Sequence, residues 1–401
     1  MSAEIKEWNL DDTHLVFLND ECMNFLAYAT IPLHAIGISA AINSLQRQGK
    51  DLHGYIMILA HPVTGRAVKR EDFHFDAPNI QIVDGEFSYI KPRGLSQKLK
   101  DRFSAIYEAG KRRSREIFVA GPDIYAFPYT MIDHSKSNSS ITMIMIDDGA
   151  GSYESFASHY ISTAKFYSKD KKLLKRIIAV LVAVVNCVLA SRLYNRAKSG
   201  GALLDYRLFL RSKTSKKQWE SNLAICDDYK NVFSKLGNKN NSLWECLNGC
   251  VLINTQPLIE CGMIEGDIDL RLYEKVISSL NGLCDNIVIK PHPREVDIIK
   301  YKSIKAEVLD DSSVSQEVML ASLKRQPCCI ISLFSSTLLN AKGIFKVPAI
   351  SLAKIFVKED ISLTLKKQLK NYIKQYEGMF EFPETIEALQ QYVQKILDNK
   401  D

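Results

Sequence analysis

The stretch at residues 286–295 reads NIVIKPHPRE, and it decides the fold of its half of the chain. A short run of apolar, mostly β-branched residues at 287–289 precedes a charged segment with two prolines. This is the pattern of a buried strand that ends at a turn. In an open α/β sheet, ligands bind at the carboxyl ends of the strands. The sequence therefore predicts that His292, Arg294 and Glu295 lie at a binding site.

Three other apolar runs end in polar groups in the same way. They are residues 141–146 before Asp147, Asp148 and Gly149, residues 251–254 before Thr255, Gln256 and Pro257, and residues 328–332 before Ser335, Ser336 and Thr337. Carboxylates, an imidazole and hydroxyls at strand ends are the groups that a group-transfer active site needs. The sequence thus places a candidate active site at these motifs.

Outward from these motifs, strand-like and helix-like segments alternate in two series, as in parallel sheets with helices on both faces. The strands expected in the first series are residues 14–18, 55–59, 80–83, 116–120 and 141–146, with helices at 32–47 and 95–109. The strands expected in the second are residues 251–254, 287–289, 329–332 and 347–352, with helices at 271–283, 314–323, 336–343, 363–376 and 383–397. The prediction is therefore an α/β chain with two doubly wound halves and a cleft between them.

The region from about residue 153 to residue 239 breaks this alternation. It is rich in lysine and helix-forming residues, so we expect a helical insertion. A polar stretch at residues 237–241 has turn chemistry and marks the expected domain boundary. The predicted domains are residues 1–240, including the insertion, and residues 241–401, including two terminal helices.

Composition is that of an ordinary globular protein, with 46% hydrophobic and 24% charged residues in 401 positions. The net charge of +6 is compatible with an anionic partner but selects none. Nine cysteines follow no regular spacing, which favours reduced thiols, and the first residues lack a signal-peptide pattern. We therefore expect a cytoplasmic protein.

The longest apolar run, IIAVLVAVVNCVLA at residues 177–190, lies within the basic segment 169–198. It is short for a transmembrane helix. One interpretation is an interfacial helix on an anionic membrane surface, which would make the protein peripheral at the inner membrane. The other is a buried core helix or a subunit contact, as in a homodimer.

Each polar motif also has a purely structural interpretation. The acid pair with its glycine is common turn chemistry, and His292 between two prolines is a rigid turn. Hydroxyls at a helix start cap free amides, although the same groups bind phosphate. Functionally, a carboxylate at Asp147 or Asp148 suits a general base, and an imidazole at His292 can donate a proton to a departing phosphate.

Several function classes lack their motifs. The sequence contains no GxxxxGK[ST] loop and no GxGxxG after a strand, so ATP- or dinucleotide-driven chemistry has little support. Asp267-Ile268-Asp269 has the letters of a metal-binding glycosyltransferase motif, but it precedes a predicted helix instead of ending a strand. We expect no metal site and no nucleic-acid partner.

The order of the motifs, an acid pair with glycine, then His-Pro, then Ser-Ser-Thr, resembles that of bacterial sialyltransferases. The phrases VLINTQPLIE (251–260), NIVIKPHPRE (286–295) and SLFSSTLLNA (332–341) are most similar to glycosyltransferase family 52. That family includes the lipooligosaccharide sialyltransferases. The resemblance covers about residues 251–341 and the surroundings of residues 141–149.

This resemblance implies a GT-B fold, in which two Rossmann-like domains face a central cleft. The first domain would bind the acceptor and the second the nucleotide sugar. It implies an inverting, metal-independent transfer from a CMP-activated nonulosonic acid, with no cofactor. The expected acceptor is a terminal sugar hydroxyl of a surface glycan, often galactose, on a carrier that can be lipid-linked.

The resemblance also implies residue roles. Asp148 would be the general base with Asp147 in support, and the choice between the two stays open. His292 would neutralise or protonate the leaving CMP phosphate, to which Ser335 and Ser336 would hydrogen-bond. The other residues expected at the donor are Thr255, Gln256 and Pro257 near the cytidine, and Gly149, Lys290, Pro293, Arg294, Glu295 and Thr337. Two alternatives remain, namely another CMP-nonulosonate such as pseudaminic, legionaminic or Kdo-type acid, and an inactive GT-B-like scaffold.

Overall fold

The computed structural model describes residues 24–29, 31–59, 68–85, 117–121, 141–147, 161, 172–201, 203–211, 219–237, 242–311 and 314–399. The chain divides into two compact units, residues 1–207 and 208–401. The boundary therefore lies earlier than residue 240, where the sequence placed it. The predicted strand at residues 14–18 and the predicted helix at residues 95–109 lie outside the described residues.

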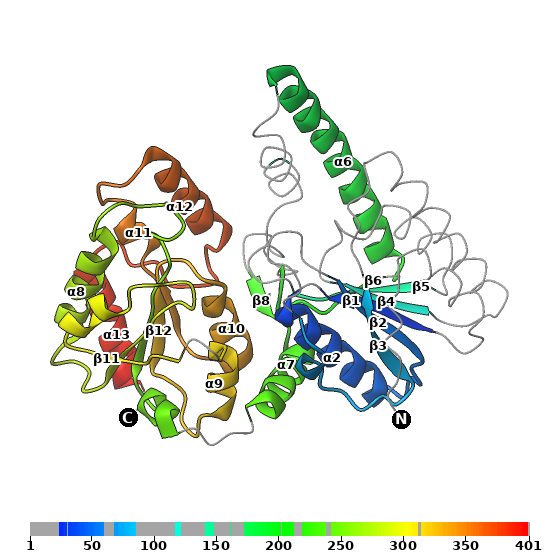
Figure 1. Cartoon of the computed structure of the whole chain (residues 1–401), viewed down its shortest axis with the longest axis horizontal. Coiled ribbons are helices and arrows are strands. Elements are labelled where there is room, and N and C mark those ends of the chain that lie inside the picture. Colours follow the sequence, from blue (N-terminus) through cyan, green and yellow to red (C-terminus); the bar gives the residue numbers. More distant parts are fainter. Residues whose placement is uncertain are drawn as a thin grey trace. The chain divides into compact units, whose positions relative to one another are not determined.

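The first unit is built on a parallel sheet of six strands (Figure 1). Its strands are β1 (Phe25–Ala29), β2 (Gly54–Leu59), β3 (Ile80–Gly85), β4 (Ile117–Gly121), β5 (Ile141–Met145) and β6 (Leu203–Asp205). Their spatial order is β3-β2-β1-β4-β5-β6, and every neighbouring pair is parallel. This is the strand order of the Rossmann fold, whose ligands bind where the order reverses, here between β1 and β4.

Helix α2 (Pro32–Arg47) follows β1 and begins with a proline in its first turn, where no backbone donor is needed. Its buried residues Ala35, Ile38, Ile42 and Leu45 recur at helical spacing and belong to the core of this unit. Close packing between strands also explains why residue 54 is a glycine. A Cβ at Gly54 would collide with the carbonyl oxygen of Phe25 on β1, so only glycine fits there.

The second unit contains a parallel sheet of five strands in the order β11-β10-β9-β12-β13. Its strands are β9 (Val251–Asn254), β10 (Ile287–Lys290), β11 (Glu307–Val308), β12 (Cys329–Ser332) and β13 (Ala349–Ser351). Its later helices are α8 (Ile268–Leu280), α9 (Gln316–Ser322), α10 (Ser336–Phe345), α11 (Ala353–Phe356), α12 (Leu363–Gln375) and α13 (Ile386–Asp398).

The central strands of this sheet are buried on both faces, which explains why they are apolar runs without alternation. One face carries Ile253, Ile289 and Ile331, which pack in a core with residues of α8, α12 and α13. The residues between them, including Leu252 and Val288, are fully buried as well. Two successive units with parallel sheets confirm the predicted α/β class of GT-B type.

The region predicted as a helical insertion is only partly helical. It contains α6 (Leu173–Ser199), but also β6 and an antiparallel pair, β7 (Phe209–Arg211) and β8 (Trp219–Ser221), before α7 (Leu223–Leu236). Strands of three residues are too short for an alternation to be recognised in the sequence. Within the described residues, no helix has the combined length and apolarity that crossing a membrane requires.

Packing of α7 explains the earlier domain boundary. This helix contacts α9 and α10, and the rings of Phe233 and Phe345 lie 6.3 Å apart. At its end, Ser322 Oγ donates to the carbonyl oxygen of Gly237 at 3.1 Å. Residues after 207 therefore belong to the core of the second unit, although their composition groups them with the preceding basic segment. Three short 3₁₀ helices complete the described elements, at Arg70–Asp72, Ser242–Leu247 and Ile299–Ser303.

Candidate active site

Three of the predicted motifs meet at one edge of the second sheet. Strand β9 pairs with β10 on one side and β12 on the other, so that Asn254 lies in register with both Lys290 and Ser332. The segments that follow these three strands therefore begin side by side. They also flank the point between β9 and β12 where the strand order reverses, which is where open α/β sheets bind ligands.

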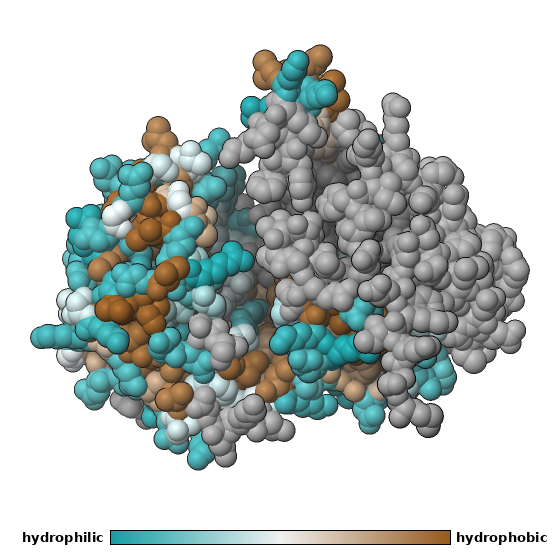
Figure 2. Space-filling model, viewed as in Figure 1, coloured by the Kyte–Doolittle hydropathy of each residue, from teal (hydrophilic) through white to brown (hydrophobic). Residues whose placement is uncertain are grey.

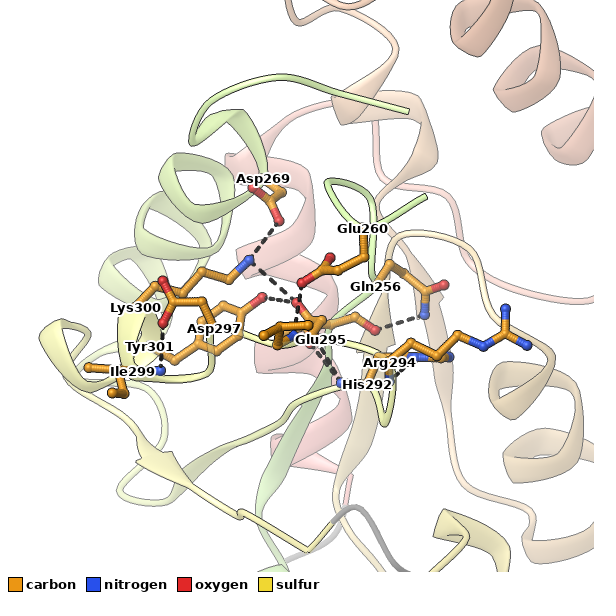
Figure 3. Close-up of polar contacts among 12 residues, drawn as sticks. Gln256, Glu260, Asp269, His292, Arg294, Glu295, Asp297, Ile299, Lys300 and Tyr301 are labelled. Carbon is orange, nitrogen blue, oxygen red and sulfur yellow. Dashed lines mark hydrogen bonds and ion pairs between the residues drawn. The ribbon is translucent and has the colours of Figure 1, made fainter. Parts of the chain in front are cut away.

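Glu295 holds the turn after β10 in place (Figure 3). Its carboxylate accepts hydrogen bonds from the backbone N–H of His292 at 2.7 Å and from the hydroxyl of Tyr301 at 2.5 Å. The hydroxyl of Thr255 also donates to it and accepts from His292 N–H at 3.1 Å. The turns after β9 and β10 are thus joined through one buried carboxylate.

The environment of Glu295 is a small buried cluster of charges. Lys300 Nζ lies 3.4 Å from Glu295 Oε1 and 3.5 Å from Asp269 Oδ2 (Figure 3). Burial raises the pKa of the Tyr301 hydroxyl, and the nearby Tyr273 and Glu295 raise it further. The hydroxyl therefore stays protonated and can donate a hydrogen bond. The side chain of Glu295, which the sequence placed at the donor site, is 0% exposed, and its described contacts are to residues of the protein itself.

His292 is half-buried and held in a defined state. Its Nδ1 accepts a hydrogen bond from the backbone N–H of Arg294 at 3.1 Å (Figure 3). The neutral ring therefore carries its proton on Nε2. Burial lowers the pKa of His292, the charges of Arg294 and Lys290 lower it further, and Glu260 opposes them. At neutral pH the imidazole is therefore an uncharged Nε2–H donor.

The Ser335-Ser336-Thr337 motif forms the start of α10. Both interpretations of this motif, helix capping and phosphate binding, place it there. Ser335 is the N-cap, and its Oγ accepts from the backbone N–H of Thr337 at 3.2 Å. The Ser335 and Thr337 hydroxyls lie 2.8 Å apart, and Asn254 Nδ2 donates to Thr337 Oγ1 at 3.1 Å. The first amides of a helix and nearby hydroxyls bind anionic groups well.

Asn254 was not among the predicted site residues. It ends β9, is buried, and its Oδ1 has no hydrogen-bond partner among the described residues. The signal in the sequence was one polar residue at the end of the run VLIN. Its contact with Thr337 connects the end of β9 to the start of α10.

The other predicted residues of the second unit divide by exposure. Pro293 and Arg294 are exposed, whereas Thr255, Gln256 and Pro257 are buried. Gln256 Nε2 donates to the Thr255 carbonyl oxygen at 2.8 Å, which tightens that turn. Lys290 is 5% exposed, and burial lowers its pKa while Glu317 and Asp311 oppose the shift.

The acid pair belongs to the first unit. Asp147 follows β5 and is 1% exposed, while Asp148 and Gly149 lie outside the described residues.

In the second unit, Asp267 precedes α8 and Asp269 is paired with Lys300. The structure therefore gives a structural role to the Asp-x-Asp letters that the sequence had already discounted as a metal motif.

The family model for alpha-2,8-polysialyltransferase (POLYST) matches residues 28–354. The chain belongs to the alpha-2,8-polysialyltransferase family. The matched range includes every site residue predicted from the sequence, and it confirms a glycosyltransferase of the sialyltransferase kind. It does not confirm the finer resemblance to glycosyltransferase family 52. No curated protein sequence matches the chain.

Solved structures similar to this polysialyltransferase-family chain include a putative UDP-N-acetylglucosamine 2-epimerase from Listeria monocytogenes. That structure has a TM-score of 0.45 and 12% identity, covering 94% of this chain and 88% of the other. A sialyltransferase from Photobacterium damsela has a TM-score of 0.44 and 12% identity, covering 90% and 81%. The UDP-GlcNAc 2-epimerase from Neisseria meningitidis has a TM-score of 0.38 and 13% identity, covering 94% and 100%.

Proposed function

We propose that this protein transfers sialic acid from CMP-sialic acid to a glycan hydroxyl, in an inverting reaction that needs no metal. The observation that carries the proposal is the edge of the second sheet. There an Nε2–H donor at His292 follows β10 and the hydroxyl-capped start of α10 follows β12, the two strands that flank β9 in one sheet. These groups suit a leaving phosphate, and the chain belongs to a sialyltransferase family.

The family name also bears on the acceptor. It specifies alpha-2,8-linked polysialic acid, which favours a sialic acid hydroxyl over the galactose expected from the sequence. In the proposed reaction, the acceptor oxygen forms a bond to the anomeric carbon of the donor, while the bond from that carbon to the phosphate oxygen breaks. The acceptor proton goes to Asp148, and CMP leaves. The burial of Asp147 supports Asp148 as the base, because a proton acceptor must reach the sugar.

Negative charge builds on the phosphate as that bond breaks. His292 Nε2–H, the hydroxyls of Ser335 and Ser336 and the first amides of α10 would stabilise this charge. Fixed donors of this kind are each worth about 3–4 kcal/mol in the transition state. Glu295 would act indirectly, since its carboxylate accepts from the His292 N–H and its own N–H donates to the His292 carbonyl oxygen.

The test uses the whole chain with CMP-sialic acid and two matched oligosaccharide acceptors, one ending in sialic acid and one in galactose. We expect transfer to the sialic acid terminus and thermal stabilisation by CMP, but not by UMP, ADP or GDP. A shift specific for UMP or GDP would refute the donor. Transfer to galactose alone would refute the acceptor, and full turnover by Asp148→Ala would refute the base.

A pair of N-cap variants separates phosphate binding from helix stability. Ser335→Ala and Ser362→Ala each remove a hydroxyl that caps a helix of the second unit, at α10 and α12 respectively. Each should lower the unfolding free energy by about 1 kcal/mol. Only Ser335→Ala should also weaken CMP binding, measured by isothermal titration calorimetry. Equal CMP affinity in the two variants would remove Ser335 from the donor site.

A further inference from the structure

Helix α6 exposes apolar side chains along most of its length. At least seven of them are 43% exposed or more, namely Leu173, Leu174, Ile177, Ile178, Leu181, Val184 and Val188. Exposed apolar residues scattered singly are ordinary, but a continuous group marks an interaction surface. Figure 2 shows apolar and hydrophilic residues side by side at the exposed end of this helix.

The exposed residues form one stripe. Leu174, Ile177, Leu181, Val184 and Val188 are separated by steps of three and four, which places them on the same side of a helix. The stripe runs for about 21 Å along the helix axis at about 1.5 Å per residue. The opposite side includes Ala183, which is buried, and Cys187, which is half-buried. The helix is therefore covered on this side near Ala183, while the stripe on the other side is presented outward.

The charges around the stripe all have one sign. Seven basic residues lie between Asp170 and Asp205, with no acidic residue among them: Lys171, Lys172, Lys175, Arg176, Arg192, Arg196 and Lys198. Those described at the amino end, Lys172, Lys175 and Arg176, are exposed. A second copy of this helix would bring like charges together, whereas an anionic surface complements them.

The carboxyl end of α6 is fixed to the first unit. Tyr194 Oη donates to Asp205 Oδ2 at 3.5 Å, and Arg207 Nη2 lies 2.6 Å from the same oxygen. The ammonium group of Lys198 lies 5.9 Å from the centre of the Tyr194 ring. The Tyr194 hydroxyl thus ties the carboxyl end of the helix to β6, while the amino end extends away from the sheet (Figure 1).

We propose that α6 lies on an anionic lipid bilayer, with its apolar stripe at the boundary between headgroups and acyl chains and its basic residues at lipid phosphates. The apolar run of residues 177–190 rises about 20 Å, less than the hydrocarbon core of about 30 Å, so the helix lies along the surface. The proposal does not depend on the reaction that the second unit performs.

Vesicle flotation of the whole chain tests it, with phosphatidylcholine vesicles that contain or lack phosphatidylglycerol. The wild-type protein should bind only the anionic vesicles, and high salt should weaken binding. The double variant Ile177→Glu/Leu181→Glu should bind the anionic vesicles with an affinity at least about tenfold lower. Leu363→Glu changes a leucine on α12 that is more exposed than Ile177 or Leu181, and this variant should bind as the wild type does.

A charge variant provides a second measurement. Lys172→Glu/Lys175→Glu/Arg176→Glu leaves the apolar stripe intact and should also lose binding to anionic vesicles by about tenfold or more. Unchanged thermal unfolding and CMP binding would show that each variant is folded. The proposal is overturned if the wild type ignores anionic vesicles or binds neutral ones equally well. It is also overturned if both variants bind vesicles as the wild type does. A wild-type dimer that binds no vesicles, and that the stripe variant converts to a monomer, would overturn it as well.

Discussion

His292→Ala is expected to lower kcat by about 10²–10³-fold, the range seen when one fixed hydrogen-bond donor to a developing negative charge is removed. The physical reason is the fixed state of the ring. Nδ1 is occupied by the Arg294 amide, so Nε2–H is the group available to a leaving phosphate. Initial rates with CMP-sialic acid measure the effect. His53→Ala is the matched control, because His53 precedes β2 at the amino end of a strand, pairs with Asp51 and should leave kcat unchanged.

The pH dependence of CMP affinity gives the same prediction a second readout. In the free protein the pKa of His292 lies below its usual 6.5, so the ring is neutral at pH 7. A bound phosphate anion favours the imidazolium and raises that pKa, so binding takes up a proton. Affinity should therefore increase as the pH falls toward 6.5. His292→Gln should remove this part of the slope and leave only the titration of CMP itself. An unchanged slope would place the phosphate away from His292.

Glu295→Ala should lower the unfolding free energy of the second unit by about 3–5 kcal/mol, because it removes a buried carboxylate that pairs with one cation and accepts several hydrogen bonds. Lys300 keeps Asp269 but loses one of its two carboxylates, and the Tyr301 hydroxyl and the His292 amide each lose an acceptor. Urea unfolding followed by tryptophan fluorescence suits the measurement, since Trp219 and Trp244 both lie in this unit.

Two further variants show whether burial is the cause. Glu384→Ala removes the exposed partner of Lys354 in the same unit and should cost less than about 1 kcal/mol. Glu295→Gln keeps the size of the side chain and one acceptor oxygen, so its loss of unfolding free energy should lie between those of the other two variants. Its kcat should also fall, because the turn that carries His292 is less firmly held. A loss at Glu295 no larger than that at Glu384 would contradict the described cluster.

The second sheet could be predicted from the sequence because its central strands are buried on both faces. Such strands are continuous apolar runs, and runs such as VLIN and CIIS are easily recognised. Strand β1, FLAYA, was missed. Two of its five residues are alanines, which are depleted in strands, so its local strand preference is weak and its place in the sheet depends on pairing with β2 and β4.

The site was predictable as a set of motifs but not as a set of orientations. Parallel strands guarantee that the segments after β9, β10 and β12 meet at one edge, so the positions of Thr255, His292 and Ser335 followed from the pattern. Whether a side chain points outward or inward depends on tertiary contacts. Glu295 and Arg294 are adjacent and equally charged in magnitude, yet one is buried among Tyr301 and Lys300 and the other is exposed.

Among the described residues, those that hydrogen-bond to His292 all belong to the second unit, which has an evolutionary consequence. Mutations that accumulate in residues 1–207 leave Glu295, Thr255 and Tyr301 untouched. Under the proposed reaction, the groups that stabilise the leaving nucleotide would then be inherited intact while the preference for the acceptor sugar diverges. Lineages of such enzymes would then vary fastest in one half of the gene and slowest in the other.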